Sequence, residues 1–303
     1  MTHKQADGEL MKVNSGYIGR FAPSPSGPLH FGSAVAALAS FLQARQRGGQ
    51  WQIRIDDLDP PREQRGATRS ILDVLVALGL EWDGPVTYQS QRSSAYENAL
   101  QKLADAGLTF PCACTRKQLG GRPYPGNCRN GVRAGLSART LRVRVDDRIV
   151  SFVDALQGGQ QQQLSDVVGD FILVRADGYY SYHLAVVVDD HDAGITEIVR
   201  GVDLIESTPR QVYLQRLLGC PTPEYVHIPV VLNETGTKLS KQTFAAPIDA
   251  KNPAHTLFKA LRFLSQRPPL ELAHADVSDI LQWAQEHWDL AAIGSSSSTH
   301  RNH

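Results

Sequence analysis

Apolar and polar positions in the N-terminal part of the chain predict a strand, a helix and a second strand. Residues 16–22 (GYIGRFA) form an apolar stretch that opens into a loop rich in Pro, Ser and Gly. Apolar residues then recur at the spacing of one helix face over 33–47, and the run at 51–59 predicts a strand that ends in acidic residues. A strand–helix–strand unit within about forty residues favours a parallel sheet.

The rest of the chain continues this mixture of helices and strands. Further helices are expected over 62–79, 93–106, 254–265 and 276–290, and further strands over 167–175, 183–188 and 223–233. Residues 112–148 are rich in Cys, Arg and Gly with weak periodicity, so we interpret them as an insertion into the α/β fold. The Ser-rich end, 294–303, is expected to be disordered.

Composition places the chain among ordinary soluble globular proteins. It has 303 residues, of which 42% are hydrophobic and 20% are charged, and no apolar run approaches the ~20 residues of a membrane span. The N-terminal residues lack the apolar core of a secretory signal, so we expect a cytoplasmic protein with no membrane partner.

The formal net charge is zero, which argues against a dedicated nucleic-acid binder, but the charge is unevenly distributed. Residues 112–148 carry nine basic side chains and two acidic ones, Asp146 and Asp147. The basic ones are Arg116, Lys117, Arg122, Arg129, Arg133, Arg139, Arg142, Arg144 and Arg148. Two interpretations remain open, a solvated basic face and a surface that faces phosphate groups.

Three of the four cysteines, Cys112, Cys114 and Cys128, lie close together in the sequence. Four cysteines are too few for a disulfide framework at this length, and in a reducing compartment their crowding indicates a metal site. A structural zinc takes four N or S ligands, and no His lies between Cys112 and Cys128. Counting alone therefore suggests the distant Cys220 as the fourth ligand.

The loop RFAPSPSGPLHFGS (20–33) lies between the first predicted strand and the first predicted helix. Ligands bind beyond the carboxyl ends of parallel strands, where a helix N-terminus offers N–H groups to anions. Gly27 and Gly32 let the backbone approach a ligand closely, and the His30 ring can donate to a phosphate. An isolated H-x-G is more often structural, and the chain has neither a G-x-G-x-x-G motif nor a P-loop.

A second basic motif, KLSK (238–241), follows a predicted strand and a Gly-containing turn. Lys238 and Lys241, with Ser240 between them, can bring two cations to a polyphosphate leaving group. In this order, the two motifs resemble the HIGH and KMSKS motifs of class I aminoacyl-tRNA synthetases. RFAPSPSGPLHFGS, IRIDDLDPPRE, YHLAVVVDD and IVRGVDL are similar to the glutamyl branch over about residues 16–250, and the whole chain resembles its short members.

The resemblance implies an α/β fold, with the Rossmann-like parallel sheet of class I synthetases, a zinc-bearing insertion and a short C-terminal helical segment. We therefore expect a first catalytic segment at 14–111 and a zinc-containing, tRNA-facing insertion at 112–181. A second catalytic segment with the KLSKQ loop is expected at 182–250, followed by the helical segment at 251–293.

The resemblance also implies the residues of the active site. The glutamate-binding residues would be Arg20, Phe21, Ala22, Pro23, Ser24, Asp56, Tyr182 and Arg200. ATP would be held by His30, Gly32, Ser240 and Lys241, and the catalytic residues would be His30, Lys238 and Lys241. Asp56 stands where the family usually has Glu, so its reach to the substrate ammonium is one methylene shorter. Alternatively, Tyr182 is a core residue and Arg200 pairs with Glu197.

Two cofactors follow from the same resemblance. One structural Zn²⁺ would be held by Cys112, Cys114, Tyr124 and Cys128, with the Tyr124 phenolate in place of Cys220. Mg²⁺ would accompany ATP. Three reduced, buried cysteines without a metal are the alternative.

The implied activity is tRNA-independent activation of L-glutamate with ATP to glutamyl-adenylate. Glutamate would then pass to the queuosine base in the anticodon loop of tRNA(Asp). Only 61 residues follow Gln242, where conventional glutamyl synthetases carry a helical anticodon-binding region. The alternatives are a minimal conventional glutamyl-tRNA synthetase, a nucleotidyltransferase with the same H-x-G loop, and a non-catalytic tRNA-binding module. We expect a monomer.

Overall fold

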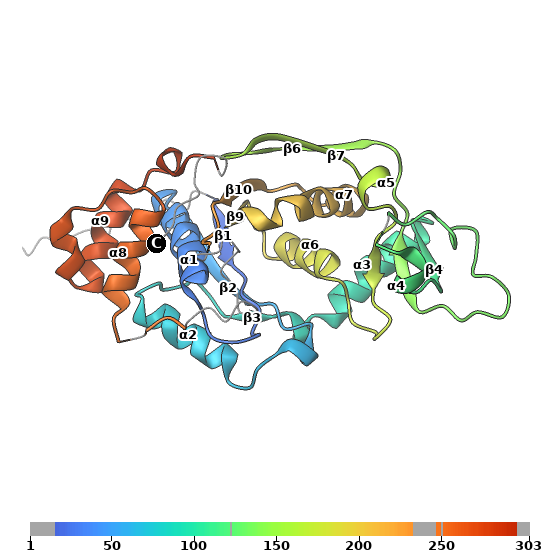
Figure 1. The fold of residues 1–303 in the computed structure, drawn as a ribbon, viewed down its shortest axis with the longest axis horizontal. Helices are drawn as coiled ribbons and strands as arrows, with labels where there is room; N and C mark the ends of the chain where they lie inside the picture. Colours follow the sequence, from blue (N-terminus) through green and yellow to red (C-terminus); the bar gives the residue numbers. More distant parts are fainter. Residues whose placement is uncertain (1–15, 122, 233–246, 250, 296–303) are drawn as a thin grey trace, which may run out of the picture.

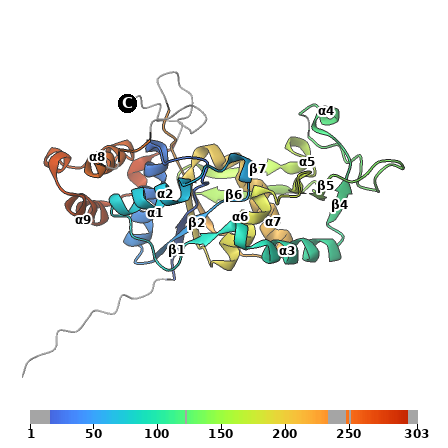
Figure 2. The same cartoon turned by 90° about the horizontal axis from the view of Figure 1, so that it is seen from below.

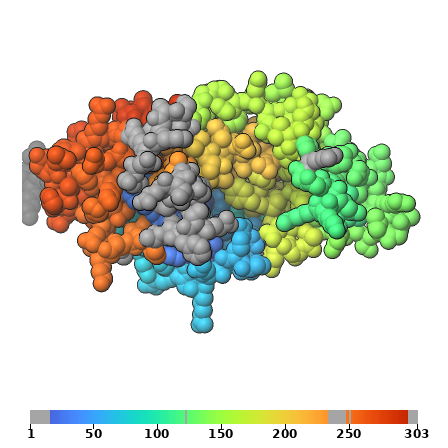
Figure 3. All heavy atoms as spheres, viewed as in Figure 1, coloured from blue at the N-terminus to red at the C-terminus, as the bar shows by residue number. Residues whose placement is uncertain are grey.

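The computed structural model describes residues 16–121, 123–232, 247–249 and 251–295. Lys238, Ser240 and Lys241 lie outside the described residues, as does the predicted tail beyond Ser295. The described part is elongated, with helices α8 (Pro253–Phe263) and α9 (Val277–His287) at one end (Figure 1). Strand β4 (Thr109–Cys112) and helix α4 (Arg116–Leu119) lie at the other end, and Figure 2 and the space-filling view in Figure 3 show the same arrangement.

Parallel strands form the centre of the molecule. Strand β2 (Gln50–Ile55) pairs in parallel with β1 (Ile18–Phe21) and with β3 (Thr87–Tyr88), and β9 (Glu197–Gly201) pairs in parallel with β10 (Glu224–Ile228). Strands β1 and β9 lie side by side, where the Thr196 N–H donates to the Ile18 carbonyl at 2.9 Å. The strand order therefore changes direction between β1 and β9, and such a switch point is where open α/β sheets bind ligands. The predicted parallel sheet is confirmed.

Helix α1 (Phe31–Gln46) packs between this sheet and the helices α8 and α9. The sequence predicts an amphipathic helix at this place, but residues 37–44 of α1 are all buried. Small residues allow this burial, and Ser40 satisfies its hydroxyl by donating to the Ala37 carbonyl and accepting from the Trp51 indole N–H at 2.9 Å. Burial on all sides fixes the N-terminus of α1 against the ends of the strands.

Helix α6 (Tyr182–Asp192) corrects the prediction of a strand at 183–188. Its first turn is capped by the Ser181 hydroxyl, which accepts from the Leu184 N–H at 3.4 Å. The residues from Leu184 to Asp190 are all buried, so no polar face reveals the helical period in the sequence. A Val-rich run without a polar face is indistinguishable from a buried strand by its pattern.

Two other elements that flank the sheet were predicted with different bounds. Helix α2 (Ala67–Ala77) is shorter than the predicted 62–79, because residues 60–62 form a separate turn of 3-10 helix that begins with two prolines. Helix α3 (Ser93–Asp105) lies within the predicted 93–106. The acidic residues that follow β2 lie in a loop after Ile55 rather than at the end of the strand.

The segment between α3 and α6 contains strands that the sequence pattern did not indicate. Strands β4, β5 (Thr140–Val143) and β8 (Ile172–Val174) form an antiparallel sheet. Strands β6 (Ile149–Asp154) and β7 (Gly158–Gln163) form a hairpin, and β6 joins β10 through Asp154 and Tyr225. Only residues 172–174 of the expected strand at 167–175 form a strand, which is β8, and Val167 is the last residue of α5 (Leu164–Val167).

Helix α7 (Thr208–Leu218) packs against α6 and β6. None of the described helices is long and apolar enough to cross a membrane.

Candidate active site

A cleft of about 690 Å³ lies at the carboxyl ends of β1, β9 and β10. Its lining joins the loop after β1 to residues 199–201 of β9 and residues 228–231 at and after the end of β10, at the switch point of the sheet. The lining includes these sequence-predicted residues: Arg20, Phe21, Ala22, Pro23, Ser24, His30, Gly32, Tyr182 and Arg200. Asp56 lies in a smaller adjoining cavity of about 150 Å³, which shares Ser24 and Tyr182 with the cleft.

His30 is the N-cap of α1. Its Nδ1 accepts a hydrogen bond from the Ser33 N–H at 3.2 Å, which ties the ring to the first turn of the helix. Gly32 and Ser33 of the same turn line the cleft, so the positive end of the α1 dipole faces it. This is a suitable place for the phosphates of a nucleotide.

The described residues on both sides of the segment 233–246 border the same cleft. Val231 lines the cleft, and Pro247 forms a bridge with His30. The Ile248 N–H also donates to the Leu29 carbonyl at 3.0 Å.

A buried network of charged side chains lies beneath the cleft. Arg20 Nε and Nη2 donate to the two carboxylate oxygens of Asp190 at 3.2 and 3.3 Å. Arg54 Nη1 donates to Asp190 at 2.5 Å, and Arg54 Nε donates to Asp56 at 2.7 Å. Burial raises the pKa of Asp190, but Arg20 and Arg54 outweigh it and hold that pKa below its usual value. Asp190 therefore stays ionised between the two arginines.

Asp189 extends this network toward α3. Its carboxylate accepts from Arg92 Nε at 2.5 Å, from the Gln89 amide at 2.8 Å and from the Tyr96 hydroxyl at 2.9 Å. Sequence reasoning did not single out Asp189 or Asp190 as site residues. Their signal was two adjacent acids at the end of an apolar run, since a carboxylate is buried only where it has partners.

Asp56 sits in the adjoining cavity with its carboxylate held by Arg54. Burial raises the pKa of Asp56 to about 6, against the opposing effect of the Arg54 guanidinium. The carboxylate is ionised at neutral pH and lies where it could accept a cationic group from the cavity.

Arg200 lies at the end of β9, and only 5% of it is exposed. Its Nε donates to His227 Nε2 at 3.0 Å, and its Nη2 donates to the Thr208 hydroxyl at 2.7 Å and to the side-chain oxygen of Gln211, Oε1, at 2.8 Å. The alternative ion pair with Glu197 does not form, because Glu197 accepts from the Tyr17 hydroxyl and the Gln43 amide. Arg200 is thus held in place by neutral groups, and its positive charge is available to a ligand in the cleft.

Tyr182 is the first residue of α6 and is 39% exposed, so it is not a core residue. It lines the cleft, the adjoining Asp56 cavity and a third cavity on the side of β8. Its position makes it the common wall of all three.

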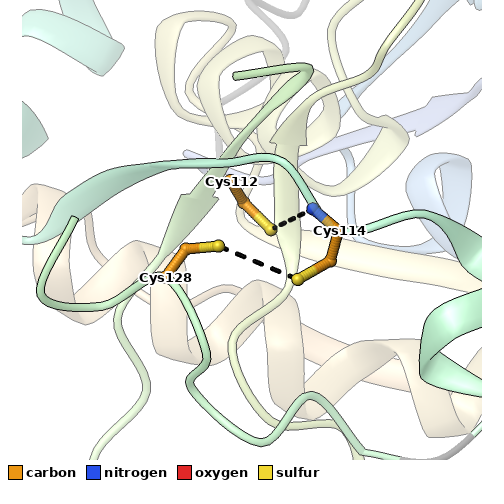
Figure 4. A group of neighbouring side chains, drawn as sticks. All are labelled: Cys112, Cys114 and Cys128. Carbon is orange, nitrogen blue, oxygen red and sulfur yellow. Dashed lines mark hydrogen bonds between the residues drawn. The ribbon is translucent and has the colours of Figure 1, made fainter. Parts of the chain in front are cut away.

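Cys112, Cys114 and Cys128 come together at the far end of the molecule (Figure 4). Their sulfur atoms all lie within 4.8 Å of one another, and the Cys114 and Cys128 sulfurs are 3.7 Å apart. Two sulfurs bound at about 2.3 Å to a tetrahedral zinc lie about 3.8 Å apart, so the spacing fits a metal ion.

The Tyr124 hydroxyl completes this group. Its oxygen is 3.4 Å from the Cys112 sulfur and 4.0 Å from the Cys114 sulfur. The Tyr124 backbone is held against Gly169, where a Cβ would lie 2.4 Å from the Tyr124 carbonyl oxygen. The Arg142 guanidinium lies 4.1 Å from the centroid of the Tyr124 ring, on the face of the ring. Three sulfurs and one phenol oxygen make a group of four possible ligands, which is the number that a structural zinc takes.

Cys220 is not part of this group. It follows α7 and packs with the core around α3, α6 and α7. It also lines a cavity with Lys102. Counting cysteines suggested Cys220 as the fourth ligand. That suggestion is wrong, because Cys220 lies in a different cluster from the other three cysteines.

The basic residues of 112–148 do not form one uniform surface. Arg122 lies outside the described residues. Four make internal contacts: Arg129 pairs with Asp170, Arg148 pairs with Asp146, and Arg142 and Arg144 stack on aromatic rings. The remaining four, Arg116, Lys117, Arg133 and Arg139, are exposed. Only part of this charge is available to a partner.

Comparison with known proteins identifies the family of this chain. Residues 18–122 and 125–256 match the family model of the catalytic domain of class I tRNA synthetases (E and Q). The chain belongs to this family.

Curated relatives place this class I synthetase more narrowly. It is 53% identical to the glutamyl-Q tRNA(Asp) synthetase of Aromatoleum aromaticum, over 91% of this chain and 90% of the relative. It is 52% identical to the protein of the same name from Dechloromonas aromatica, over 93% of this chain and 97% of the relative. The chain is therefore a ligase-type enzyme of the glutamyl-Q tRNA(Asp) synthetase group.

Solved structures confirm the fold of this synthetase. A glutamate tRNA ligase from Elizabethkingia meningosepticum, in complex with its amino acid, superposes with a TM-score of 0.76 at 24% identity. The superposition covers 92% of this chain and 66% of the ligase, so the chain spans just under two thirds of that protein.

Proposed function

We propose that the enzyme activates L-glutamate with ATP and transfers it to the queuosine base in the anticodon loop of tRNA(Asp). The names of relatives at 50–53% identity over 91–93% of the chain are the observation that carries this proposal. In the first step the α-carboxylate of glutamate attacks the α-phosphate of ATP, and pyrophosphate leaves with Mg²⁺. The protein contributes mainly position and charge.

Glutamate recognition would use the charged groups around Tyr182. Arg200 Nη1 is buried at the cleft and has no hydrogen-bond partner among the described residues, so it can bind a substrate carboxylate. Asp56 would accept the substrate ammonium from the adjoining cavity. Nε and Nη2 of Arg20 both face Asp190, so Arg20 would act on glutamate through its positive potential rather than through a two-pronged pair with a substrate carboxylate.

ATP would bind along the N-terminus of α1. His30 and Gly32 lie there, and the helix dipole favours the phosphates. Lys238, Ser240 and Lys241 lie in sequence between Val231, which lines the cleft, and Pro247, which forms a bridge with the cleft residue His30. This supports a role for Lys238 and Lys241 in stabilising the leaving pyrophosphate.

We assign a structural Zn²⁺ to Cys112, Cys114, Tyr124 and Cys128. Burial raises the pKa of Cys112, but its hydrogen bonds with the Tyr124 hydroxyl and the Cys114 N–H, together with Arg142, bring it down to about 7. A thiol that ionises near neutral pH is a ready zinc ligand. The ion would hold the end of β4 against the loop that carries Cys128.

The nucleic acid would bind in a third cavity of about 740 Å³, which we call the arginine basin. Five arginines line it: Arg62, Arg116, Arg142, Arg175 and Arg210. Arg62 and Arg175 contact Asp59, whereas the other three form no ion pair with a described residue. Because the basin shares Tyr182 with the amino-acid cleft, phosphates bound there would bring a loop of nucleic acid to the adenylate.

Exchange of pyrophosphate into ATP tests the activation step. The charged side chains of the cleft are held by contacts within the chain, so glutamate and ATP alone should support exchange. Glutamine and aspartate serve as control substrates and should give little exchange. Lys241→Ala should lower the exchange rate far more than it raises the KM for glutamate. The reason is that a lysine charge that stabilises the leaving pyrophosphate acts mainly in the transition state. Exchange that requires tRNA would contradict the proposal.

A further inference from the structure

A buried hydrogen-bond chain leads from the hairpin β6–β7 to Arg200 through two residues that the activation step does not use. Asp154 ends β6, and its Oδ2 lies 2.6 Å from His227 Nδ1. His227 lies on β10, and its Nε2 accepts from Arg200 Nε at 3.0 Å. The side chains of Asp154 and His227 are completely buried.

The hydrogen bonds define one protonation form of the His227 ring. Nε2 must be unprotonated, because it faces an arginine N–H and an arginine has no acceptor. The ring proton therefore sits on Nδ1 and is donated to the Asp154 carboxylate. Burial lowers the pKa of His227, although Asp154 opposes this, so the ring is neutral.

The same contacts account for three of the five N–H donors of Arg200. Nε donates to His227, and Nη2 donates to Thr208 and Gln211. The two donors on Nη1 have no partner among the described residues, and Arg200 lines the cleft. A rotation of the guanidinium group would break these three bonds, so they fix the direction of Nη1.

We infer that Asp154 and His227 are positioning residues, which hold Arg200 in the orientation that binds a carboxylate of the amino-acid substrate. The inference rests on the proposed function, since glutamate is taken as that substrate. It also links the inserted hairpin to the amino-acid cleft, because Asp154 belongs to β6 and accepts from the Leu156 and Gln157 N–H groups of the hairpin turn.

Asp154→Asn tests the chain of contacts without changing its shape. The amide oxygen should stay with the Leu156 and Gln157 N–H groups and keep its 3.3 Å contact with the His227 backbone N–H, which turns the amide NH₂ toward His227 Nδ1. The ring proton must then move to Nε2, where it opposes the N–H of Arg200. The KM for glutamate in the exchange assay should rise roughly tenfold to a hundredfold, while the KM for ATP stays within about twofold. Asp166→Asn, an exposed carboxylate on α5, is the matched control and should leave both KM values unchanged.

A pair of substitutions at the histidine separates positioning from packing. His227→Gln keeps an acceptor for Arg200 Nε and should retain much of the affinity for glutamate. His227→Phe keeps the ring volume but has no acceptor, and should lose affinity as Asp154→Asn does. The ¹⁵N shifts of the His227 ring should show Nδ1–H in the unsubstituted enzyme and Nε2–H in Asp154→Asn.

The outcomes distinguish this inference from the proposed function. If the unsubstituted enzyme shows no glutamate-dependent exchange, the proposed substrate is wrong, and the ¹⁵N shifts still test the hydrogen-bond chain. An unchanged KM for glutamate in Asp154→Asn overturns the inference, as do equal losses in His227→Gln and His227→Phe or an Nε2–H ring in the unsubstituted enzyme.

Discussion

At the scale of single residues, the cleft depends on charges that neutralise one another. Asp190 lies between Arg20 and Arg54, and removal of its carboxylate would leave Arg20 buried without its counter-ion, whereas Arg54 would keep Asp56. Arg200 is different, because its partners Thr208, Gln211 and His227 are neutral. The substrate carboxylate is therefore expected to be the counter-ion of Arg200.

Asp56 should make glutamate binding depend on pH. Its pKa, raised by burial to about 6, means that the carboxylate gains its charge as the pH rises through that value. Only the ionised form can hold the substrate ammonium, so the KM for glutamate should fall between about pH 5 and about pH 7 and then level off. The measurement is the pyrophosphate-exchange rate as a function of glutamate concentration at each pH.

Two variants control the pH experiment. Asp56→Asn should raise the KM about tenfold or more and remove its pH dependence, because the charge is lost at every pH. Asp56→Glu restores the residue that the family usually carries and should keep the KM within about threefold. A KM that is constant across this range in the unsubstituted enzyme would show that Asp56 does not hold the ammonium.

The same shift has a consequence for stability with a definite sign. The pKa of Asp56 in the folded protein lies above its ordinary value of 3.8, so the folded state binds this proton more tightly than the unfolded state. The contribution of Asp56 to the free energy of unfolding is therefore largest below about pH 4 and declines as the pH rises to about 6.

At the scale of elements, the sequence predicted the structure best where local pattern and environment agree. Strand β1, helix α3 and the loop between β1 and α1 have clear apolar runs and turn residues, and they were found close to their expected positions. Helix α6 was mistaken for a strand because it is buried on all sides. Strand β7 contains a run of glutamines that form a strand only through pairing with β6.

The candidate site shows the same limit. The motif residues around His30 and Tyr182 were found from the sequence and meet in one cleft. The role of Asp190 could not be read from the sequence, because its partners Arg20 and Arg54 are 170 and 136 residues away. Such a pairing forms only when the chain brings α6 to β1 and β2, and the sequence around Asp190 shows no more than two adjacent acids.

The cysteine group permits a test at the scale of one element. Purified protein should contain about one zinc per chain, and Cys112→Ser should lose it. Tyr124→Phe removes the fourth ligand. The variant should therefore lose its zinc at a lower chelator concentration than the unsubstituted protein does. Metal content by mass spectrometry and chelator competition are the measurements.

Cys220→Ser is the matched control for the metal experiment, since Cys220 lies in a different cluster of the protein. It should leave the zinc content and its retention unchanged. Loss of zinc in Cys220→Ser together with full retention in Tyr124→Phe would contradict the assigned ligands.

At the scale of the whole molecule, the arginine basin lies between the amino-acid cleft and the cysteine group. Its lining combines Arg116 of α4 with Arg210 of α7, and it meets the cleft at Tyr182. Burial, with Arg210 and Arg200 nearby, lowers the pKa of His183 to about 3, so the positive charge of the basin comes from its arginines. A ligand with several phosphates suits this charge.

Arg116→Ala should weaken tRNA binding and reduce its dependence on salt. Each lost phosphate contact lowers the slope of log K against log salt by about 0.7 to 0.9. Exchange with glutamate and ATP should stay within about twofold, because Arg116 does not line the amino-acid cleft. Arg69→Ala, an exposed arginine of α2 outside the basin, is the control. Equal effects of the two substitutions on tRNA binding would show that the basin is not the binding site.

Glutamate transfer to tRNA(Asp) whose 3′ end has been oxidised with periodate tests the proposed function most directly. Periodate destroys the ordinary acceptor diol, so a conventional synthetase cannot charge the treated tRNA. The reagent can also attack the diol of queuosine, so the base must be protected during treatment, or a modified anticodon stem-loop without an acceptor end can replace the whole tRNA. We expect glutamate transfer to these substrates and none to tRNA(Asp) that lacks queuosine. Charging of unmodified tRNA(Glu) that periodate abolishes would contradict the proposed function.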